Sequence, residues 1–411
     1  MAGLPLADVR VLDLTRLLPG GFCSLLLADL GADVLKVEDT GMGDYVRWSP
    51  PYYGGEEQQG LGTRSALYLS LNRGKRSIRL DLKSERGREA LLRLVGSHDV
   101  VLDGFRPGVL DRLGVGYERL REANPAVVVA AITGYGQDGP NAQRAGHDIN
   151  YLALTGLLGL TGEHNGPPVS AAGQIADVNG GLMAAIGVLA ALNERRRSGE
   201  GQYVDVSMAD GALSWLAFVA AGYLCDGEVP RRGEGPLSGG FACYRSYQAA
   251  DGWVSCGALE PKFWAAFCNG VGRPDLIEKQ FEAPGSPAHA EIAAVFRSRS
   301  REEWRTFNDQ HDCCIEPVLD LDEALGSELV RAREMVVELD QPEIGPVRLL
   351  GNPIKLSRTP GDPSRPAPAL GEHTEEVLRE AGYSEQEVAA LLESGAAAGC
   401  DPAAGGGEFR A

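Results

Sequence analysis

The first part of the chain alternates short apolar runs with stretches of helical spacing. Residues 8–14 and 32–38 are runs rich in Val and Leu, and residues 22–30 between them show helical spacing that ends at Gly31. Residues 17–21 contain Pro and two Gly and predict a turn before that helix. A strand, a helix and a second strand in this order predict a βαβ unit, and therefore a parallel sheet.

The same alternation continues to about residue 225. Residues 39–70 are rich in Gly, Tyr and Glu and predict a long surface loop. Further strands are predicted at 77–83, 100–102, 126–132 and 202–206, and helices at 85–95, 109–113 and 177–197. No GxGxxG sequence follows the first strand, so the dinucleotide fingerprint is absent.

The character of the chain changes after residue 225, where a Pro/Gly-rich segment leads into short strands and small helices. We therefore predict an α/β protein with a large Rossmann-like parallel-sheet domain over 1–225 and a smaller α+β domain over 226–335. A Pro-rich return segment and C-terminal helices, 336–394, should pack on the large domain. The Ala/Gly-rich tail, 395–411, should be disordered.

Composition narrows the range of partners. The 411 residues carry a net charge of −18, which argues against nucleic acid or an anionic membrane as the main partner. No apolar run approaches the ~20 residues of a membrane span, and the N-terminus has no signal-peptide core, so we expect a cytoplasmic protein. The eight cysteines are scattered without metal-ligand spacing, so no metal site is predicted.

Two titratable side chains stand at the starts of helix-like runs. His147 precedes an apolar run that begins at residue 149, and Asp177 precedes the long run over 182–192. Helix starts offer free N–H groups and the positive end of the helix dipole. A neutral imidazole facing a carboxylate suits a two-base proton transfer, although an Asp at a helix start also serves as an ordinary N-cap.

Basic and aromatic residues form candidate ligands for an anion. Arg73, Lys75 and Arg76 cluster in a turn before a strand, as a phosphate clamp or as a solvated basic turn. Phe105, Arg106 and Arg112 follow another strand and are suited to holding an adenine ring and phosphates.

Several stretches together resemble one superfamily, the class III CoA-transferases and α-methylacyl-CoA racemases, also called the carnitine-dehydratase/bile-acid-inducible family. They occur in the family's order at 30–38, 72–83, 105–108, 136–140, 201–207 and 371–374. The resemblance implies an interlocked homodimer, with a CoA thioester as substrate and no further cofactor. Lys36 and Tyr135, in or beside these stretches, complete the predicted CoA-binding set.

Residues 146–151 (GHDINY) and 257–263 (GALEPKF) are similar to the racemase branch. In that branch His147 and Asp177 fall on the positions of the two opposing bases. The resemblance also implies that Asp148 and Glu260 orient and tune the imidazole. The implied activity is epimerisation at the α-carbon of a 2-methyl-branched acyl-CoA.

Two other functions remain open from the sequence. Residues 69–77 and the long segment before them look more like the transferases, in which Asp177 would be a nucleophile that forms an aspartyl-CoA thioester. A non-catalytic acyl-CoA-binding protein is the third reading, and it would bind CoA without turnover.

Overall fold

The computed structural model describes residues 3–55 and 64–400 and divides the chain into two compact units. The larger unit comprises Met1–Tyr151, Gln174–Ala212 and Glu328–Ala411, and the smaller unit comprises Leu152–Gly173 and Leu213–Ser327. The sequence placed the division between domains near residue 225, whereas the structure places it at Leu213. Residues Leu152–Gly173 also belong to the smaller unit.

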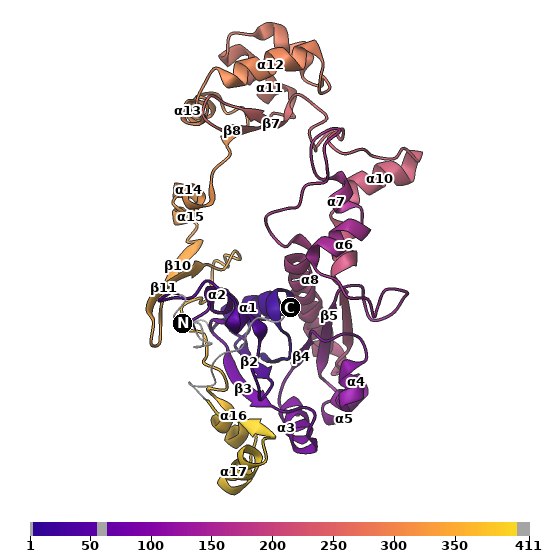
Figure 1. Ribbon diagram of the computed structural model, residues 1–411, viewed down its shortest axis with the longest axis vertical. Helices are drawn as coiled ribbons and strands as arrows, with labels where there is room; N and C mark the ends of the chain where they lie inside the picture. The colour runs from indigo at the N-terminus through magenta and orange to yellow at the C-terminus, as the bar shows by residue number, and fades with distance from the viewer. Residues whose placement is uncertain (1–2, 56–63, 401–411) are drawn as a thin grey trace. The chain divides into compact units, whose positions relative to one another are not determined.

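The larger unit is built on a seven-stranded sheet (Figure 1). Its strand order is β12 (Ala397–Ala398), β3 (Arg76–Leu80), β2 (Asp33–Glu38), β1 (Arg10–Asp13), β4 (Val100–Asp103), β5 (Val128–Thr133) and β6 (Tyr203–Ser207). All neighbours pair in parallel except β12, which runs antiparallel to β3. The predicted parallel sheet is confirmed, and its strands read as apolar runs because helices cover the sheet.

Helices of the larger unit connect and cover these strands. They are α1 (Leu17–Asp29), α2 (Ala66–Asn72), α3 (Glu85–Val95), α4 (Val109–Leu113), α5 (Tyr117–Ala123), α8 (Ile175–Ser198), α9 (Met208–Ser214), α15 (Glu328–Ala332), α16 (Thr374–Glu380) and α17 (Glu385–Glu393), with a 3₁₀ turn, η1, at Tyr45–Trp48. Helix α6 (Asp148–Leu154) begins in the larger unit and ends in the smaller one, and the last two residues of α9 also belong to the smaller unit.

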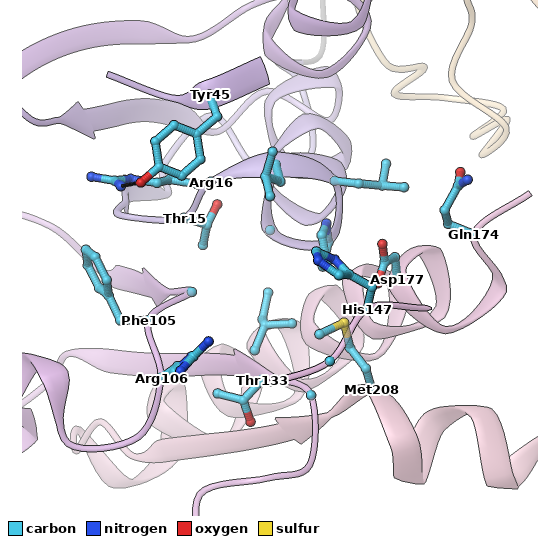
Figure 2. A pocket seen from close by; sticks show the side chains of 18 of the residues that line it. Thr15, Arg16, Tyr45, Phe105, Arg106, Thr133, His147, Gln174, Asp177 and Met208 are labelled. Carbon is cyan, nitrogen blue, oxygen red and sulfur yellow. Dashed lines mark hydrogen bonds between the residues drawn. The ribbon is translucent and has the colours of Figure 1, made fainter. Parts of the chain in front are cut away.

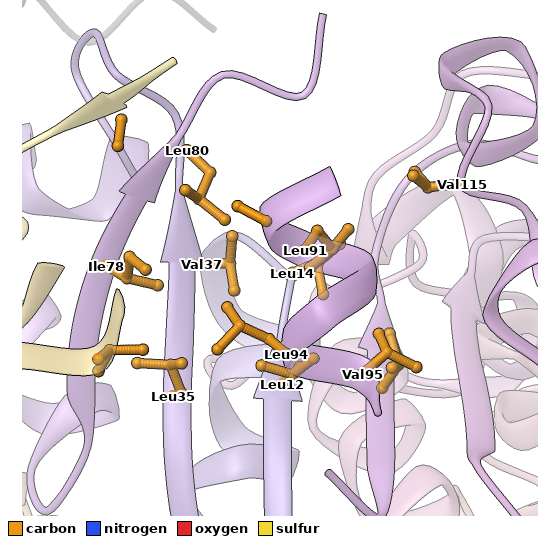
Figure 3. Close-up of a cluster of buried hydrophobic side chains, with 14 of the residues drawn as sticks. Leu12, Leu14, Leu35, Val37, Ile78, Leu80, Leu91, Leu94, Val95 and Val115 are labelled. Carbon is orange, nitrogen blue, oxygen red and sulfur yellow. The ribbon is translucent and has the colours of Figure 1, made fainter. Parts of the chain in front are cut away.

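One apolar cluster joins the sheet to α3 and the C-terminal helices (Figure 3). Leu12, Leu35 and Ile78 point from three strands toward Leu91 and Leu94 of α3, and all five are buried. The same cluster includes Val377 and Leu378 of α16 and Val388 and Leu391 of α17. The C-terminal helices thus pack on the larger unit.

Helices α1 and α8 pack closely together. A side chain at Gly181 would place its Cβ 2.6 Å from the Pro19 carbonyl oxygen, so only glycine permits this approach. Since Asp177 stands one turn before Gly181 on α8, the contact also fixes where Asp177 lies.

Two local predictions near the N-terminus are wrong. Residues 17–21 form the first turns of α1 rather than a separate turn, because Pro19 falls where a helix needs no N–H donor. Residues 39–70 are not a surface loop in their described part: Val46, Arg47, Tyr68 and Leu69 are buried. Their core also includes Leu339 and Val347 of a later hairpin.

The end of the chain also differs from its prediction. The Pro-rich return segment begins with a hairpin, β10 (Val336–Gln341) and β11 (Gly345–Leu350). Ala396 and Ala397 are buried, and the backbone here pairs with β3, so residues 396–398 are ordered because they cover a sheet edge. Residues 401–411 of the predicted disordered tail lie outside the described residues.

The smaller unit contains short strands and helices. Strands β7 (Tyr244–Gln248), β8 (Trp253–Gly257) and β9 (Ile315–Pro317) form an antiparallel sheet. The helices are α7 (Leu157–Leu160), α10 (Ala217–Asp226), α11 (Pro261–Gly270), α12 (Pro287–Arg297), α13 (Arg301–His311) and α14 (Leu321–Leu325), with a 3₁₀ helix, η3, at Pro274–Lys279. Stacked aromatic rings fill its core: Phe296 lies 4.2 Å from Tyr247 and 5.0 Å from Phe267 between ring centroids.

Helix α8 is long and apolar enough to cross a membrane by length and composition, and α9 with α10 would qualify as a bent pair. Half of the most apolar window of α8 is buried inside the protein, as in a core helix. The sequence prediction that no stretch approaches such a length is wrong for α8, because Asn179 and three Gly interrupt its apolar run without breaking the helix.

Candidate active site

A cavity of about 1030 Å³ opens in the larger unit at the carboxyl ends of β1, β4 and β5 (Figure 2). Thr15, Gly104 and Thr133 follow or end these strands and line the cavity. Ligand sites of open α/β sheets lie at this edge, where strand ends leave a crevice. Its walls also receive residues from η1, α2 and the first turn of α8.

The cavity is basic although the chain is acidic. Arg16, Arg106, Arg144 and His147 line it, and Asp177 is the one carboxylate among the described lining residues. A protein with a net charge of −18 therefore presents a local site for an anionic ligand.

Asp177 stands in the first turn of α8, with its carboxyl partly buried. Burial and, to a lesser extent, the Asp148 carboxylate raise the pKa of Asp177 to about 6, with His147 acting in the opposite direction. Figure 2 shows the His147 imidazole beside this carboxyl in the cavity. The predicted pair is thus brought together in one pocket.

His147 is held through its backbone by the residues that follow it. Its N–H donates to Asn150 Oδ1 at 3.0 Å, and its carbonyl oxygen accepts from Asn150 N–H at 2.8 Å. The Tyr151 hydroxyl donates to the Gly146 carbonyl oxygen at 2.6 Å. These contacts explain why Asn150 and Tyr151 accompany His147 in the sequence, a role that sequence reasoning did not assign.

Asp148 has a role in the structure that the resemblance did not imply. Its Oδ1 accepts from the backbone N–H of Ala176 at 2.6 Å and of Asp177 at 3.2 Å. Asp148 therefore caps the start of α8, where the N-cap residue Gln174 makes no side-chain cap bond. The Asp148 carboxylate also raises the pKa of Asp177.

Glu260 belongs to the smaller unit, where it is the exposed N-cap residue of α11. Its predicted hydrogen bond to His147 stays a prediction.

The predicted CoA ligands fall into two groups. Phe105 and Arg106 line the cavity, while Arg112 on the short helix α4 and Tyr135 do not. Tyr135 instead packs edge-on against Tyr151, with ring centroids 5.1 Å apart.

The other four predicted cations are engaged in ion pairs. Lys36 Nζ lies 2.8 Å from Asp44, Arg73 pairs with Asp29 at 2.7 Å, and Lys75 contacts Asp13 at 3.4 Å. All three cations are buried. Arg76 pairs with Asp33 and Glu380. Carboxylates of the protein neutralise these four cations, so the geometry does not favour a phosphate clamp. The carboxylate partners of Arg73, Lys75 and Arg76 lie far away in the sequence, so local spacing did not indicate them.

Sequence reasoning missed Arg16, which lies in the cavity wall. Its guanidinium donates to Tyr45 Oη at 2.9 Å and to Asp39 Oδ2 at 2.8 Å, and it lies 5.0 Å from the Tyr45 ring centroid. Arg16 lies in the loop just after the first strand of a parallel sheet, and that position is the signal that would have found it.

Comparison with known proteins agrees with this geometry. The sequence model of CoA-transferase family III matches residues 6–374. The chain belongs to this family. In the described part of the chain, no group of three or more His, Cys, Asp or Glu side chains is arranged to hold a metal ion.

Relatives within the family divide between two activities. A succinyl-CoA:mesaconate CoA-transferase of Haloarcula marismortui is 37% identical over 92% of this chain and 96% of its own length. An alpha-methylacyl-CoA racemase of Mus musculus is also 37% identical, over 94% and 96%. A crystal structure of a CAIB/BAIF family protein from Brucella suis is 31% identical, with a TM-score of 0.80 over 92% of this chain and all of that one. Family membership thus establishes an enzyme family that acts on acyl-CoA, and both activities occur among the relatives.

Proposed function

We propose that the protein is an α-methylacyl-CoA racemase that inverts the α-carbon of a 2-methyl-branched acyl-CoA by proton transfer between two bases. The observation that carries this proposal is the presence of His147 and Asp177 together in one cavity. Inversion needs a base on one face of the carbon and an acid on the other, and these two side chains supply one of each.

In the proposed reaction one group removes the α-proton and the thioester carbonyl takes up the negative charge as an enolate. The other group then donates a proton to the opposite face. His147 is the base for one epimer and Asp177 for the other. The positive end of the α8 dipole favours negative charge at this place. The N–H groups of Ala176 and Asp177 at this helix start already donate to Asp148 Oδ1.

Proton affinity supports the same roles. A carboxyl that titrates near its ordinary value of ~3.9 would be a poor proton donor at neutral pH. Burial and Asp148 raise the pKa of Asp177 to about 6. A carboxyl with this pKa can both bind and release a proton near neutral pH, as the two directions of the proposed reaction require.

The substrate's CoA portion fits the charge of the cavity. Arg16, Arg106 and Arg144 surround a space of about 1030 Å³, which is large for a small metabolite and suited to an extended anionic thioester. Phe105 lies beside this basic wall in Figure 2. We propose that the CoA phosphates bind there and that no further cofactor takes part.

A CoA-transferase is the second candidate, favoured by the Asp177 carboxylate in the cavity and by relatives such as the Haloarcula marismortui enzyme. In that reaction Asp177 would attack the thioester carbonyl and His147 would have no chemical step.

Variants that lack one of the two proposed catalytic bases distinguish the racemase from the CoA-transferase. In heavy water, His147→Ala should still exchange the α-proton of the epimer that faces Asp177, without inverting it. Asp177→Ala should show the same behaviour for the other epimer. A His147→Ala variant that racemises at the rate of the unmodified protein contradicts the proposal. An aspartyl-CoA thioester trapped on Asp177, which disappears when a second carboxylic acid is added, would instead support the transferase.

A further inference from the structure

A second cavity, of about 320 Å³, lies in the larger unit beside α4 and α5. It shares no lining residue with the first cavity. One water molecule occupies about 30 Å³ in the liquid, so this space is much larger than a single hydration site. Its size falls at the lower end of the range of small-molecule pockets.

Asp103, the last residue of β4, lies at this cavity with only 7% of its surface exposed. Its Oδ1 accepts from Phe105 N–H at 2.8 Å. Among the described residues that line the cavity there is no Lys or Arg. The pKa of Asp103 is raised to about 6, mainly by burial, with the Phe105 N–H lowering it and the Asp111 carboxylate raising it. The site thus holds a buried carboxyl that lacks a counter-ion.

The other walls supply aromatic rings and a second carboxylate. Tyr117 and Tyr203 line the cavity with ring centroids 5.2 Å apart. Asp111 is exposed at the cavity, and a Cβ on Gly116 would lie 1.8 Å from its Oδ1, so glycine permits this carboxylate position. Gln137 also lines the cavity, and its Nε2 is a buried donor without a partner among the described residues.

We propose that this cavity binds a small organic ammonium ion that also carries a hydrogen-bond acceptor. The ammonium group would pair with the Asp103 and Asp111 carboxylates and contact the tyrosine rings, which attract cations. The acceptor would take the Gln137 Nε2 donor. An anion would face two carboxylates, and a neutral molecule would leave the buried Asp103 without a counter-ion.

Three matched probes test this assignment by isothermal titration calorimetry at pH 7.5. They are 3-amino-1-propanol as the cation, 1,3-propanediol as its neutral counterpart and 3-hydroxypropionate as the anion. We expect saturable binding of the amine at one molecule per chain, and at least tenfold weaker binding of the other two. Because Asp103 must lose its proton to pair with the amine, affinity should fall about tenfold from pH 7 to pH 5. Asp103, Asp111 and the two tyrosines are the titratable groups that line the cavity.

Variants connect the binding to the cavity. Asp103→Asn keeps the Oδ1 acceptor for Phe105 N–H, so it should fold normally by circular dichroism and weaken amine binding at least tenfold. Asp111→Asn should also weaken it. Glu118→Gln removes the same charge from the exposed surface of α5, outside the cavity, and should leave binding unchanged. Equal binding of the diol and the amine, full binding by Asp103→Asn, or no saturable binding of any probe, which would mean a cavity filled by water only, would each overturn the assignment.

Discussion

At the scale of single residues, the active-site hypothesis depends on how Asp177 is charged. Its carboxyl lies near two groups of opposite effect: Asp148 raises its pKa and His147 lowers it, while burial makes the largest contribution. The side chain therefore changes protonation near the pH at which the enzyme must work, as acid–base groups of enzymes often do.

This proton affinity predicts the pH dependence of racemisation. The reaction needs the His147–Asp177 pair to carry one proton, in either direction. Below about pH 6, where Asp177 binds a proton, kcat/KM should fall about tenfold per pH unit, and above the optimum it should fall as the pair loses its last proton. A rate that falls only on the acid side and stays level above it would fit an Asp177 nucleophile instead.

Asp148 offers a test of the capping role found in the structure. Asp148→Asn keeps an oxygen acceptor for Ala176 N–H but removes the negative charge that raises the pKa of Asp177. We expect the acid limb of the pH–rate profile to move to lower pH. If Asp148 instead acted on the imidazole alone, this limb would stay where it is.

The replacement of Asp148 by Ala should also cost stability. It leaves the first N–H groups of α8 without their acceptor, and loss of such a cap costs about 1 kcal/mol of the free energy of unfolding. Urea denaturation of the two variants gives the comparison, because Asp148→Asn should lose less.

At the scale of elements, the spacing of apolar residues predicted the helices and strands better than the local sequence predicted the role of the basic cluster at 73–76. The strand and helix positions follow from local apolar patterns, so α3 and the parallel strands were predicted closely. His147 and Asp177 were found because each stands at the start of a helical run. The partners of Arg73 and Lys75 lie 44 and 62 residues away in the sequence, at Asp29 and Asp13, and local patterns do not contain that information.

The prediction of a surface loop over 39–70 was wrong for a related reason. This polar, Gly-rich segment contributes Arg47 to a buried ion pair, in which Arg47 donates to both oxygens of Glu38, at 2.8 and 2.7 Å. A charge that is paired in the core resembles a surface charge when only the sequence is known. The Pro-rich return segment was also expected at the surface. Its hairpin instead packs on α2 through Val347 and Leu349, another contact between residues far apart in the sequence.

This ion pair predicts a large effect on stability. Glu38→Gln would leave the Arg47 guanidinium buried without its counter-charge, at a cost of about 3–5 kcal/mol in the free energy of unfolding. Glu375→Gln removes a carboxylate from the exposed pair with Arg379 and should cost less than about 1 kcal/mol. Chemical denaturation at pH 7 measures both, and equal losses would contradict the assigned role.

Acid should weaken the same pair in the unmodified protein. Burial alone would raise the pKa of Glu38, but the Arg47 guanidinium reverses this and holds it at about 2, below the unfolded value of 4.5. A depressed carboxyl stabilises the fold above its unfolded pKa, and this contribution is lost as pH falls from 4.5 toward 2. Denaturation of Glu38→Gln should lack this part of the pH dependence.

At the scale of the whole molecule, we propose that the protein works as a homodimer, as the family resemblance implied. Large apolar side chains lie exposed on the smaller unit: Phe218 is 87% and Leu224 81% exposed on α10, near the half-exposed Trp215. Exposed apolar side chains that gather on one element are typical of protein contacts. A second copy of the chain would cover them.

The dimer is tested by light scattering after gel filtration. We expect a mass of twice 43.6 kDa for the unmodified chain, and a shift toward the single-chain mass when Phe218 and Leu224 are both replaced by Asp. The exposed substitution Glu328→Gln on α15 serves as the control and should leave the mass unchanged. A single-chain mass for the unmodified protein at micromolar concentration would contradict the proposal.

The central claim is that His147 and Asp177 exchange the α-proton of an acyl-CoA from opposite faces. Its most direct measurement is incubation of the purified protein with one epimer of a 2-methylacyl-CoA in heavy water, without a carboxylic acid acceptor. Mass spectrometry reports α-deuterium, and chiral analysis after hydrolysis reports configuration. The account predicts deuterium uptake together with loss of chirality. No exchange under these conditions, followed by CoA transfer once succinate is added, would contradict it and identify a CoA-transferase.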